Sequence, residues 1–447
     1  MKEMKQLFSL FTLLCASIGA FCAQPTGETY KIAANPKAGF EWPYLLYVPQ
    51  NIDRSVKLPI LFTMNDSGIF DSAEELEKET CARFNRGEHE SVIACGVGVP
   101  MVVPLIPRKE GPVNAHDLNR AVFQIQEGPL KRLDLQVLAM LKDARKQLAK
   151  QDIRTQRKFL VSGFSSAGSF GWKLTLLHPK KVLALVAGGE TYPTLPASYY
   201  DTEELIFPVG VADFKKFTGK TFDKKAWNKI PIFLFNGEYD YNDPMPFDDI
   251  YGEEEKVIVK QILGDNNIQA RWKRARELLQ ELAPSVQTHT YPNTEHEPVA
   301  TDMIAFLQTH IHGGPLHPIV PQDTSVKPSW LPLKATALYW GQQAPFKHDR
   351  EYLEDTDLIV EIPITHWRSW IRGACSFDIM QDGQVILPDV KSRGAFSENQ
   401  KKFLQISLDK QEVKRLKSMP KRTFSLRSNI PQVVAIPAEL TFTIPKK

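Results

Sequence analysis

The chain contains 447 residues, of which 43% are hydrophobic and 24% charged, and its formal net charge is +3. These proportions are typical of a soluble globular protein, and a charge so near zero does not suggest a nucleic-acid partner. The length exceeds one ordinary hydrophobic core, so we expect two domains.

The N-terminus has the pattern of a secretory signal. A short basic start precedes the apolar stretch Leu7–Ala23, which ends in small residues. Cleavage is expected after Cys22, with Ala20 and Ala23 as alternatives. A retained membrane anchor is the competing interpretation, but the apolar run is short for a span. We therefore predict a signal peptide at 1–23 and a secreted or periplasmic protein with no membrane span after cleavage.

Signal cleavage would leave three of the five cysteines, Cys81, Cys95 and Cys375. In an oxidising compartment Cys81 and Cys95 could close a short disulfide loop, whereas the simpler interpretation is three buried thiols. Cys15 and Cys22 each follow a large residue where a lipid-anchor signal needs a small one, which disfavours a lipid anchor.

Between residues 28 and 311, apolar runs of strand length alternate with segments of helical spacing. The expected strands are Glu28–Ala33, Trp42–Pro49, Leu58–Met64, Met101–Leu105, Lys158–Val161, Val182–Ala187, Ile230–Phe235 and Val286–Tyr291. The expected helices are Ala73–Arg83, Leu130–Lys150, a segment ending at His178, Asn267–Leu282 and Val299–Ile311. This alternation predicts an α/β domain over residues 24–312, with a mostly parallel twisted sheet between two helical layers.

Two longer stretches interrupt the alternation. Residues 192–228 are rich in Tyr, Phe and Pro, and could form a lid or one wall of a pocket. Residues 241–265 form a second insertion.

A proline- and glycine-rich linker is expected at 313–333, followed by a separate domain at 334–447. Its short apolar runs are separated by turn residues, and one short helix is expected at Gln411–Lys417. The runs are Asp357–Ile364, Ser376–Met380, Gln384–Leu387, Phe403–Leu408, Thr423–Leu426 and Glu439–Ile444. This pattern predicts a small all-β accessory domain, with a sandwich as the expected form.

The peptide Val161–Gly168 carries the strongest indication of chemistry, because an apolar run enters a tight Gly/Ser/Ala turn and leaves as a helix. A strand, a sharp turn at a serine and a helix form the pattern of a nucleophile elbow. Such a turn brings the residues two before and two after the serine together, so both must be small. Around Ser165 they are Gly163 and Ala167, whereas a phenylalanine would clash around Ser166. We therefore predict Ser165 as the nucleophile; a plain β–turn–α unit is the alternative.

A serine nucleophile needs a base and an acid that orients the base, and loops after parallel strands supply such groups. His296 lies in the loop between the last expected strand and the last helix, and is the predicted base. Asp240 follows the strand that ends near Gly237, and is the predicted acid. Asp243 and Glu190 also follow strands and are the alternative acids.

The oxyanion of an acyl-transfer intermediate needs backbone N–H donors. One should be the N–H of Ser166, at the start of its helix, where the helix dipole also favours negative charge. The second should come from the loop after the third strand, where Asp66 and Ser67 are the candidates.

With these residues in place, the chain resembles the α/β-hydrolase superfamily over roughly residues 28–311. The residues that carry the resemblance are Gly163–Ala167, Gly237–Asp240 and His296, in that order. The serine peptide is most similar to secreted serine esterases of the polyhydroxybutyrate-depolymerase and feruloyl-esterase type. The resemblance implies a three-layer sandwich with about eight strands, Ser-His-Asp acyl transfer and no cofactor. It also implies a His-Gly pair in the loop after the third strand, which this chain lacks, and it does not extend to the β domain.

The sequence thus predicts a secreted serine hydrolase that cleaves a carboxylic ester, on a small or polymeric substrate, through an acyl-enzyme. A serine exopeptidase is the nearest alternative. The other is an inactive hydrolase scaffold that binds a surface or a carbohydrate, since four aromatic residues of the β domain could contact a sugar (Tyr339, Trp340, Trp367 and Trp370). The commoner role of such aromatics is to form the core of a small β domain.

Other patterns carry less weight. No dinucleotide or phosphate loop, zinc-protease motif or paired Cys-x-x-Cys is present. His310 and His312 could ligate a metal, but beside a Gly/Pro linker we expect them to be solvated, so no metal is predicted. His116 and Asp117 follow a strand, and we expect them to form a surface pair.

Overall fold

The computed structural model describes two parts of the chain. The N-terminal part comprises residues 26–65, 72–86, 89–109, 111–190, 192–238, 240, 242–245, 250–264, 268–292 and 294–312. The C-terminal part comprises residues 331–332, 337–340, 358–363, 366–367, 376–398, 401–428, 434–435 and 440–444. The predicted signal peptide and most of the predicted linker lie outside these residues. No helix in these described ranges is long and apolar enough to cross a membrane.

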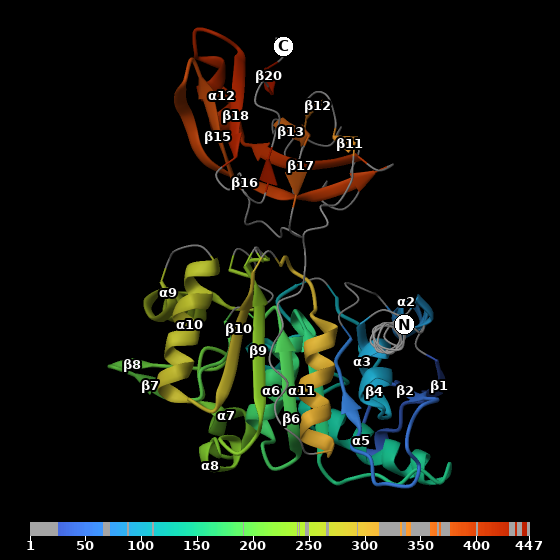
Figure 1. The fold of residues 1–447 in the computed structure, drawn as a ribbon. Coiled ribbons are helices and arrows are strands. Elements are labelled where there is room, and N and C mark those ends of the chain that lie inside the picture. Colours follow the sequence, from blue (N-terminus) through green and yellow to red (C-terminus); the bar gives the residue numbers. More distant parts are fainter. Residues whose placement is uncertain are drawn as a thin grey trace, which may run out of the picture.

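An eight-stranded sheet organises the N-terminal part, in the order β1-β2-β4-β3-β5-β6-β9-β10 (Figure 1). Strand β2 is antiparallel to both of its neighbours, and all other adjacent pairs are parallel. The strands are β1 (Gly27–Ile32), β2 (Tyr44–Pro49), β3 (Leu61–Phe62), β4 (Met101–Pro104), β5 (Phe159–Phe164), β6 (Val182–Gly188), β9 (Ile232–Gly237) and β10 (Val286–Tyr291). The mostly parallel sheet predicted from the sequence is confirmed.

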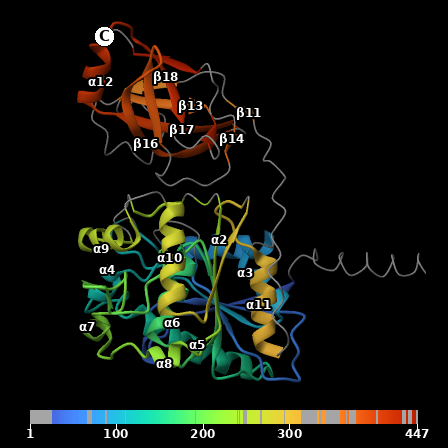
Figure 2. The same cartoon turned by 60° about the vertical axis from the view of Figure 1, so that its left-hand side comes forward.

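Helices cover both faces of this sheet, as Figures 1 and 2 show. Connections between parallel strands are right-handed. A connection to a strand nearer β10 and a connection to a strand nearer β1 therefore place their helices on opposite faces of the sheet. The connection from β3 to β4, toward β1, carries α2 (Ala73–Arg86) and α3 (His89–Val97), and α11 (Ala300–His312) packs on α3. Connections toward β10 place α5 (Leu133–Ala149), α6 (Ser166–Leu177) and α10 (Ile268–Leu282) on the other face, while α4 (Arg120–Gln124) and the 3-10 helix η2 (Pro36–Ala38) lie in connections.

The central strands are covered on both faces, as their continuous apolar runs predict. All six residues of β5 are buried, and so are all six of β9. Strand β3 covers only Leu61–Phe62 and is shorter than the predicted run Leu58–Met64, although the whole run is buried. Leu58 forms an isolated bridge with Thr155.

The 192–228 insertion contains little regular structure. Its elements are the hairpin β7 (Tyr199–Tyr200) and β8 (Glu203–Glu204) and the short helices α7 (Phe214–Thr218) and α8 (Lys224–Trp227). Four of its aromatic rings pack between one ring of α4 and one of α6 in a continuous cluster. In it each ring lies 5.3–6.1 Å from the next (Phe123, Phe207, Phe214, Phe222, Trp227 and Trp172). The second insertion contains the helix α9 (Glu253–Leu263).

The C-terminal part is an antiparallel β unit in which β16 is shared by two halves of one hydrogen-bonded path. The first half of β16 pairs with β15 and the second half with β17, with an irregularity between Ser392 and Gly394. The antiparallel β region predicted from the sequence is confirmed, and its two halves share β16. Its strands are β11 (Leu331–Pro332), β12 (Ala337–Trp340), β13 (Leu358–Pro363), β14 (His366–Trp367), β15 (Ser376–Gln381), β16 (Gln384–Glu398), β17 (Lys401–Leu408), β18 (Thr423–Ser428), β19 (Val434–Ala435) and β20 (Thr441–Thr443).

The expected short helix is α12 (Lys410–Lys417), which begins with a capping box. Asp409 accepts from the backbone N–H of Glu412, and the Glu412 carboxylate accepts from the N–H of Asp409. Of the four aromatic residues considered for sugar binding, Trp340 lies with its ring 5.3 Å from Lys417 Nζ, and Trp370 lies outside the described residues.

Cys81 and Cys95 are both free thiols, so the disulfide considered between them is not formed. They have different partners. Cys95 Sγ lies 3.1 Å from the Tyr47 hydroxyl, and Cys81 lies beside Glu77. Both thiols are partly buried, and this burial raises the pKa of each. Cys375 lies outside the described residues.

Candidate active site

The turn between β5 and α6 places Ser165 in a backbone conformation that side chains rarely adopt, with φ 56° and ψ −131°. A Cβ atom on Gly163 would lie 2.3 Å from the Ala167 carbonyl oxygen, so only glycine fits at this position. This close approach of the residues two before and two after the serine agrees with the steric argument that selects Ser165 over Ser166.

The structure brings Asp240 and His296 together from loops that follow the neighbouring strands β9 and β10. His296 Nδ1 lies 2.8 Å from Asp240 Oδ2, and the aspartate is fully buried. Because an ionised carboxylate only accepts hydrogen bonds, Nδ1 carries the proton of the imidazole. Nε2, the other ring nitrogen, is then the basic one. The main-chain carbonyl of Asp240 accepts a hydrogen bond from Gln269 on α10.

Asn242 completes this cluster, and the sequence analysis did not identify it. Its Nδ2 lies 3.1 Å from His296 Nε2, and its backbone N–H donates to Asp240 Oδ1 at 3.1 Å. One residue thus contacts both members of the pair. On the opposite side, the Phe164 ring packs 4.7 Å from the imidazole, measured between ring centroids.

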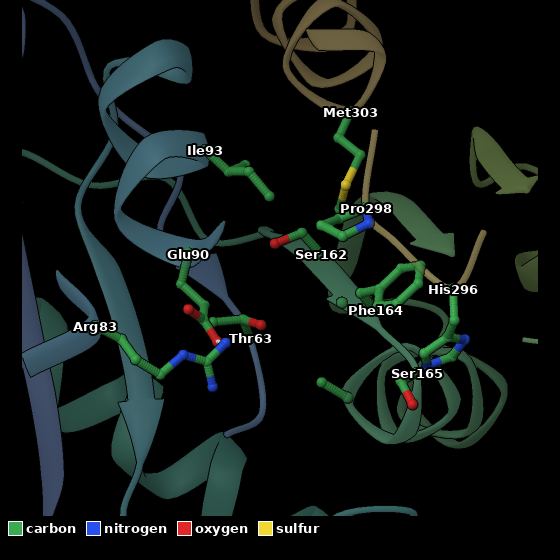
Figure 3. A pocket seen from close by; sticks show the side chains of 12 residues that line it. Thr63, Arg83, Glu90, Ile93, Ser162, Phe164, Ser165, His296, Pro298 and Met303 are labelled. Atoms are coloured by element: carbon green, nitrogen blue, oxygen red, sulfur yellow. Dashed lines mark ion pairs between the residues drawn. The ribbon is translucent and has the colours of Figure 1, made fainter. Parts of the chain in front are cut away.

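Ser165 and His296 line the same cavity, which has a volume of about 200 Å³ (Figure 3). Gly189, the residue after β6, lies next to both of them. A Cβ on Gly189 would lie 3.0 Å from His296 Cε1 and 3.1 Å from the Ser165 backbone nitrogen. Gly189 also has φ 67°, which favours glycine. The arrangement therefore places a strained serine and an imidazole at one cavity wall.

Of the three residues predicted to form the oxyanion hole, the structure describes only Ser166. Ser166 is the first residue of α6, where backbone N–H groups have no acceptor within the helix. Asp66 and Ser67 lie outside the described residues. Their neighbour Asn65 is buried, and its side chain donates to the Thr80 hydroxyl on α2.

The two alternative acids have other partners. Asp243 accepts from the Tyr192 hydroxyl at 2.7 Å and pairs with Arg271 of α10 at 2.5 Å. Arg271 also donates to the Tyr192 hydroxyl at 2.7 Å. This triangle ties the loop after β9 to the start of the 192–228 insertion, and it gives Asp243 a position in the framework around the site.

Glu190 lies in a closed, buried cluster beneath the serine turn. Burial raises its pKa to about 8, although Lys173 and a hydrogen bond with Ser169 act in the opposite direction. Lys173 Nζ lies 2.5 Å from Asp117 Oδ2, and both side chains are inaccessible to solvent. The expected surface pair is therefore wrong: Asp117 pairs with Lys173, and the buried His116 Nε2 contacts the Ile106 carbonyl at 2.6 Å. Burial lowers the pKa of His116 to about 4.

Among the residues with described positions, no group of three or more His, Cys, Asp or Glu is placed to hold a metal ion. His310, one of the two histidines considered as ligands, instead packs its ring 4.7 Å from Phe306 on α11.

The strand order, with a serine-centred turn between β5 and α6, defines the N-terminal part as an α/β-hydrolase fold. No protein-family model and no curated protein matches the chain. Among solved structures, poly(aspartic acid) hydrolase-1 from Sphingomonas sp. KT-1 is 16% identical with a TM-score of 0.40, over 64% of this chain and 98% of its own.

Two further solved structures are similar at the same level. A poly(3-hydroxybutyrate) depolymerase from Bordetella parapertussis is 14% identical with a TM-score of 0.40, over 65% of this chain and 90% of its own. A ferulic acid esterase is 11% identical with a TM-score of 0.37, over 64% and 97%. The fold assignment rests on the strand order and the serine turn of this chain.

Proposed function

We propose that the protein is a serine hydrolase that cleaves a carboxylic ester, with Ser165 as nucleophile, His296 as base and Asp240 as the acid that orients the base. One observation carries the proposal: the strained Ser165 and the Asp240-bound imidazole line one cavity. Backbone strain at a serine has a cost of a few kcal/mol, and it persists where the surrounding structure over-determines it, as at active sites.

The reaction proceeds in two halves. His296 Nε2 takes the proton of Ser165 Oγ as the oxygen attacks the ester carbonyl, and Asp240 stabilises the imidazolium that forms. The oxyanion lies at the N-terminus of α6, where the Ser166 N–H donates to it. The imidazolium then protonates the departing alkoxide oxygen and the ester C–O bond breaks. Water repeats these steps on the acyl-enzyme, releasing the carboxylic acid and restoring the Ser165 hydroxyl.

During this cycle the Asn242 amide must leave His296 Nε2 before Ser165 Oγ can hydrogen-bond to that nitrogen. Its Nδ2 donates to His296 Nε2, the nitrogen that has to accept the Ser165 proton. A nitrogen lone pair accepts one strong hydrogen bond, so substrate binding has to coincide with release of the amide from the imidazole.

A fluorophosphonate probe tests the proposal, because it modifies only an activated serine. We expect the full-length protein to be labelled, Ser165→Ala to abolish labelling and Ser166→Ala to retain it. If the folded wild-type protein stays unlabelled, the chain is a binding scaffold. If Ser166→Ala alone abolishes labelling, the assignment of the nucleophile is wrong.

Secretion is part of the proposal and rests on the 1–23 segment. Expression in a bacterium with the native N-terminus, followed by fractionation and intact-mass measurement, checks it. The expected product is an extracytoplasmic protein that begins close to residue 24. Full-length protein in the cytoplasm would contradict it.

A further inference from the structure

The cavity beside Ser165 extends between the helices of one face of the sheet to an ion pair. Arg83 of α2 and Glu90 of α3 line its far end, with Arg83 Nη2 3.5 Å from Glu90 Oε1. Figure 3 shows this pair on the side of the cavity opposite Ser165 and His296. A chain attached at the nucleophile and directed into the cavity therefore meets two charged groups of opposite sign.

The Glu90 carboxylate is buried, and only one of its oxygens faces Arg83. The side chain is 7% exposed, and its Oε2 has no hydrogen-bond partner among the residues that the structure describes. The 3.5 Å separation from Arg83 is longer than the 2.7–2.9 Å of a charge-assisted hydrogen bond. A buried, unsatisfied carboxylate oxygen has a large desolvation cost, which a bound donor would remove.

The pair discriminates among ligand groups by charge. An ammonium would be repelled by Arg83, and a carboxylate by Glu90. A methyl group would leave Oε2 unsatisfied. A neutral hydroxyl fits both side chains, because its proton can be donated to Glu90 while its oxygen accepts from the guanidinium.

The cavity suits the acyl portion of a substrate better than the alcohol. The cavity is a partly open recess, and half of its twelve lining residues are at most 7% exposed (Thr63, Glu90, Ile93, Ser162, Ala167 and Met303). The alcohol must leave while the acyl group is still attached to Ser165, so a recess lined by buried residues suits the group that stays. The volume of about 200 Å³ corresponds to roughly six or seven groups of the size of water.

Resting on the function proposed above, we propose that the Arg83–Glu90 pair selects esters of short hydroxyacyl groups. The apolar wall formed by Ile93, Pro298 and Met303 accommodates the carbon chain, and the ion pair binds its hydroxyl. A site built to hydrogen-bond a hydroxyl strongly rejects the analogue without it, because its buried polar groups are then left unpaired.

The test compares 4-nitrophenyl esters that differ only by hydroxyl in place of methyl, after division by their rates of hydroxide hydrolysis. The pairs are 3-hydroxybutanoate with 3-methylbutanoate, and 6-hydroxyhexanoate with heptanoate. We expect kcat/KM of the full-length protein to favour the hydroxyl member of at least one pair by about tenfold or more. Equal values, or a preference for methyl, in both pairs would overturn the proposal.

Variants test whether the pair is responsible. Glu90→Leu should reduce the preference to about one, whereas Glu75→Gln, the loss of an exposed carboxylate on α2, should leave it unchanged. If the preference persists in a folded, probe-labelled Glu90→Leu protein, the assignment of the pair is wrong. Acetate ester separates the two proposals: turnover of acetate without hydroxyl preference refutes only this inference, and absence of both turnover and probe labelling refutes the hydrolase itself.

Discussion

Two loops at the same edge of the central sheet end in carboxylates with opposite surroundings. After β9, Asp240 is buried and bonded to an imidazole that lines the cavity. After β6, Glu190 is equally buried, but its neighbours are Lys173, Ser169 and Asp117, beneath the serine turn. Both positions after parallel strands thus supply a carboxylate, and the two carboxylates differ in the side chains that they contact.

Among the variants that test this difference between the two loops, Asp240→Asn should have the largest effect. The amide cannot hold the imidazole in its correct tautomer or stabilise its charged form, so we expect a loss of about 10⁴-fold in kcat on the best ester. Steady-state kinetics measures it, and circular dichroism controls for folding. Glu190→Gln is the matched comparison and should lose less than tenfold. Equal losses in the two variants would show that the loops do not differ in role.

Lys173→Met should affect stability, because it leaves the buried Asp117 carboxylate without its cation. Breaking a buried pair in this way costs about 3–5 kcal/mol of unfolding free energy. Urea denaturation measures this loss. The exposed Lys180, paired with Asp223 at 2.8 Å, provides the control, and Lys180→Met should change little. A fully stable Lys173→Met protein would contradict the view that the cluster supports the turn.

Glu190 should also give stability a pH dependence. Its pKa is about 8 in the folded protein against an ordinary 4.5, so between these values the folded state binds more protons than the unfolded state. The free energy of unfolding then falls as pH rises, by at most about 1.4 kcal/mol per pH unit from this group. Lys173 moderates the effect, whereas Asp117 reinforces it.

Glu190→Gln should remove that slope. Urea denaturation of both proteins between pH 5 and 8 is the measurement, and the advantage of the variant should grow steadily with pH. A constant difference across this range would mean that Glu190 does not titrate there.

Asn242→Ala should have the smallest effect. The substitution frees His296 Nε2 from the amide, so we expect fluorophosphonate labelling to be faster by up to about fivefold, the equivalent of one net hydrogen bond. The second-order rate constant of labelling measures it. A decrease of more than tenfold would instead assign the amide a role in the transition state.

The sequence predicted the sheet well because the pattern that identifies each strand lies within the strand itself. Continuous apolar runs identify buried strands, and the small residues around Ser165 identify the turn. Helix α3 was missed because its peptide is short and largely apolar, with no clear helical face. Helix α9 lies in a stretch that was interpreted only as an insertion.

The remaining features depend on contacts between distant segments. Asp243 was an alternative acid on the same loop as Asp240, and its different role depends on Arg271, which lies 28 residues later on α10. The burial of Asp117 likewise depends on Lys173, 56 residues later. Asn242 directly precedes an aspartate in a loop, which is typical of an ordinary turn, so no local pattern indicates its contact with the imidazole.

The left-handed backbone at Ser165 has a consequence for evolution of the protein. A glycine there would adopt the same φ without steric penalty, so a Ser165→Gly chain should be inactive yet unfold at a higher temperature. Thermostability selection acting without a requirement for turnover would therefore favour loss of the hydroxyl.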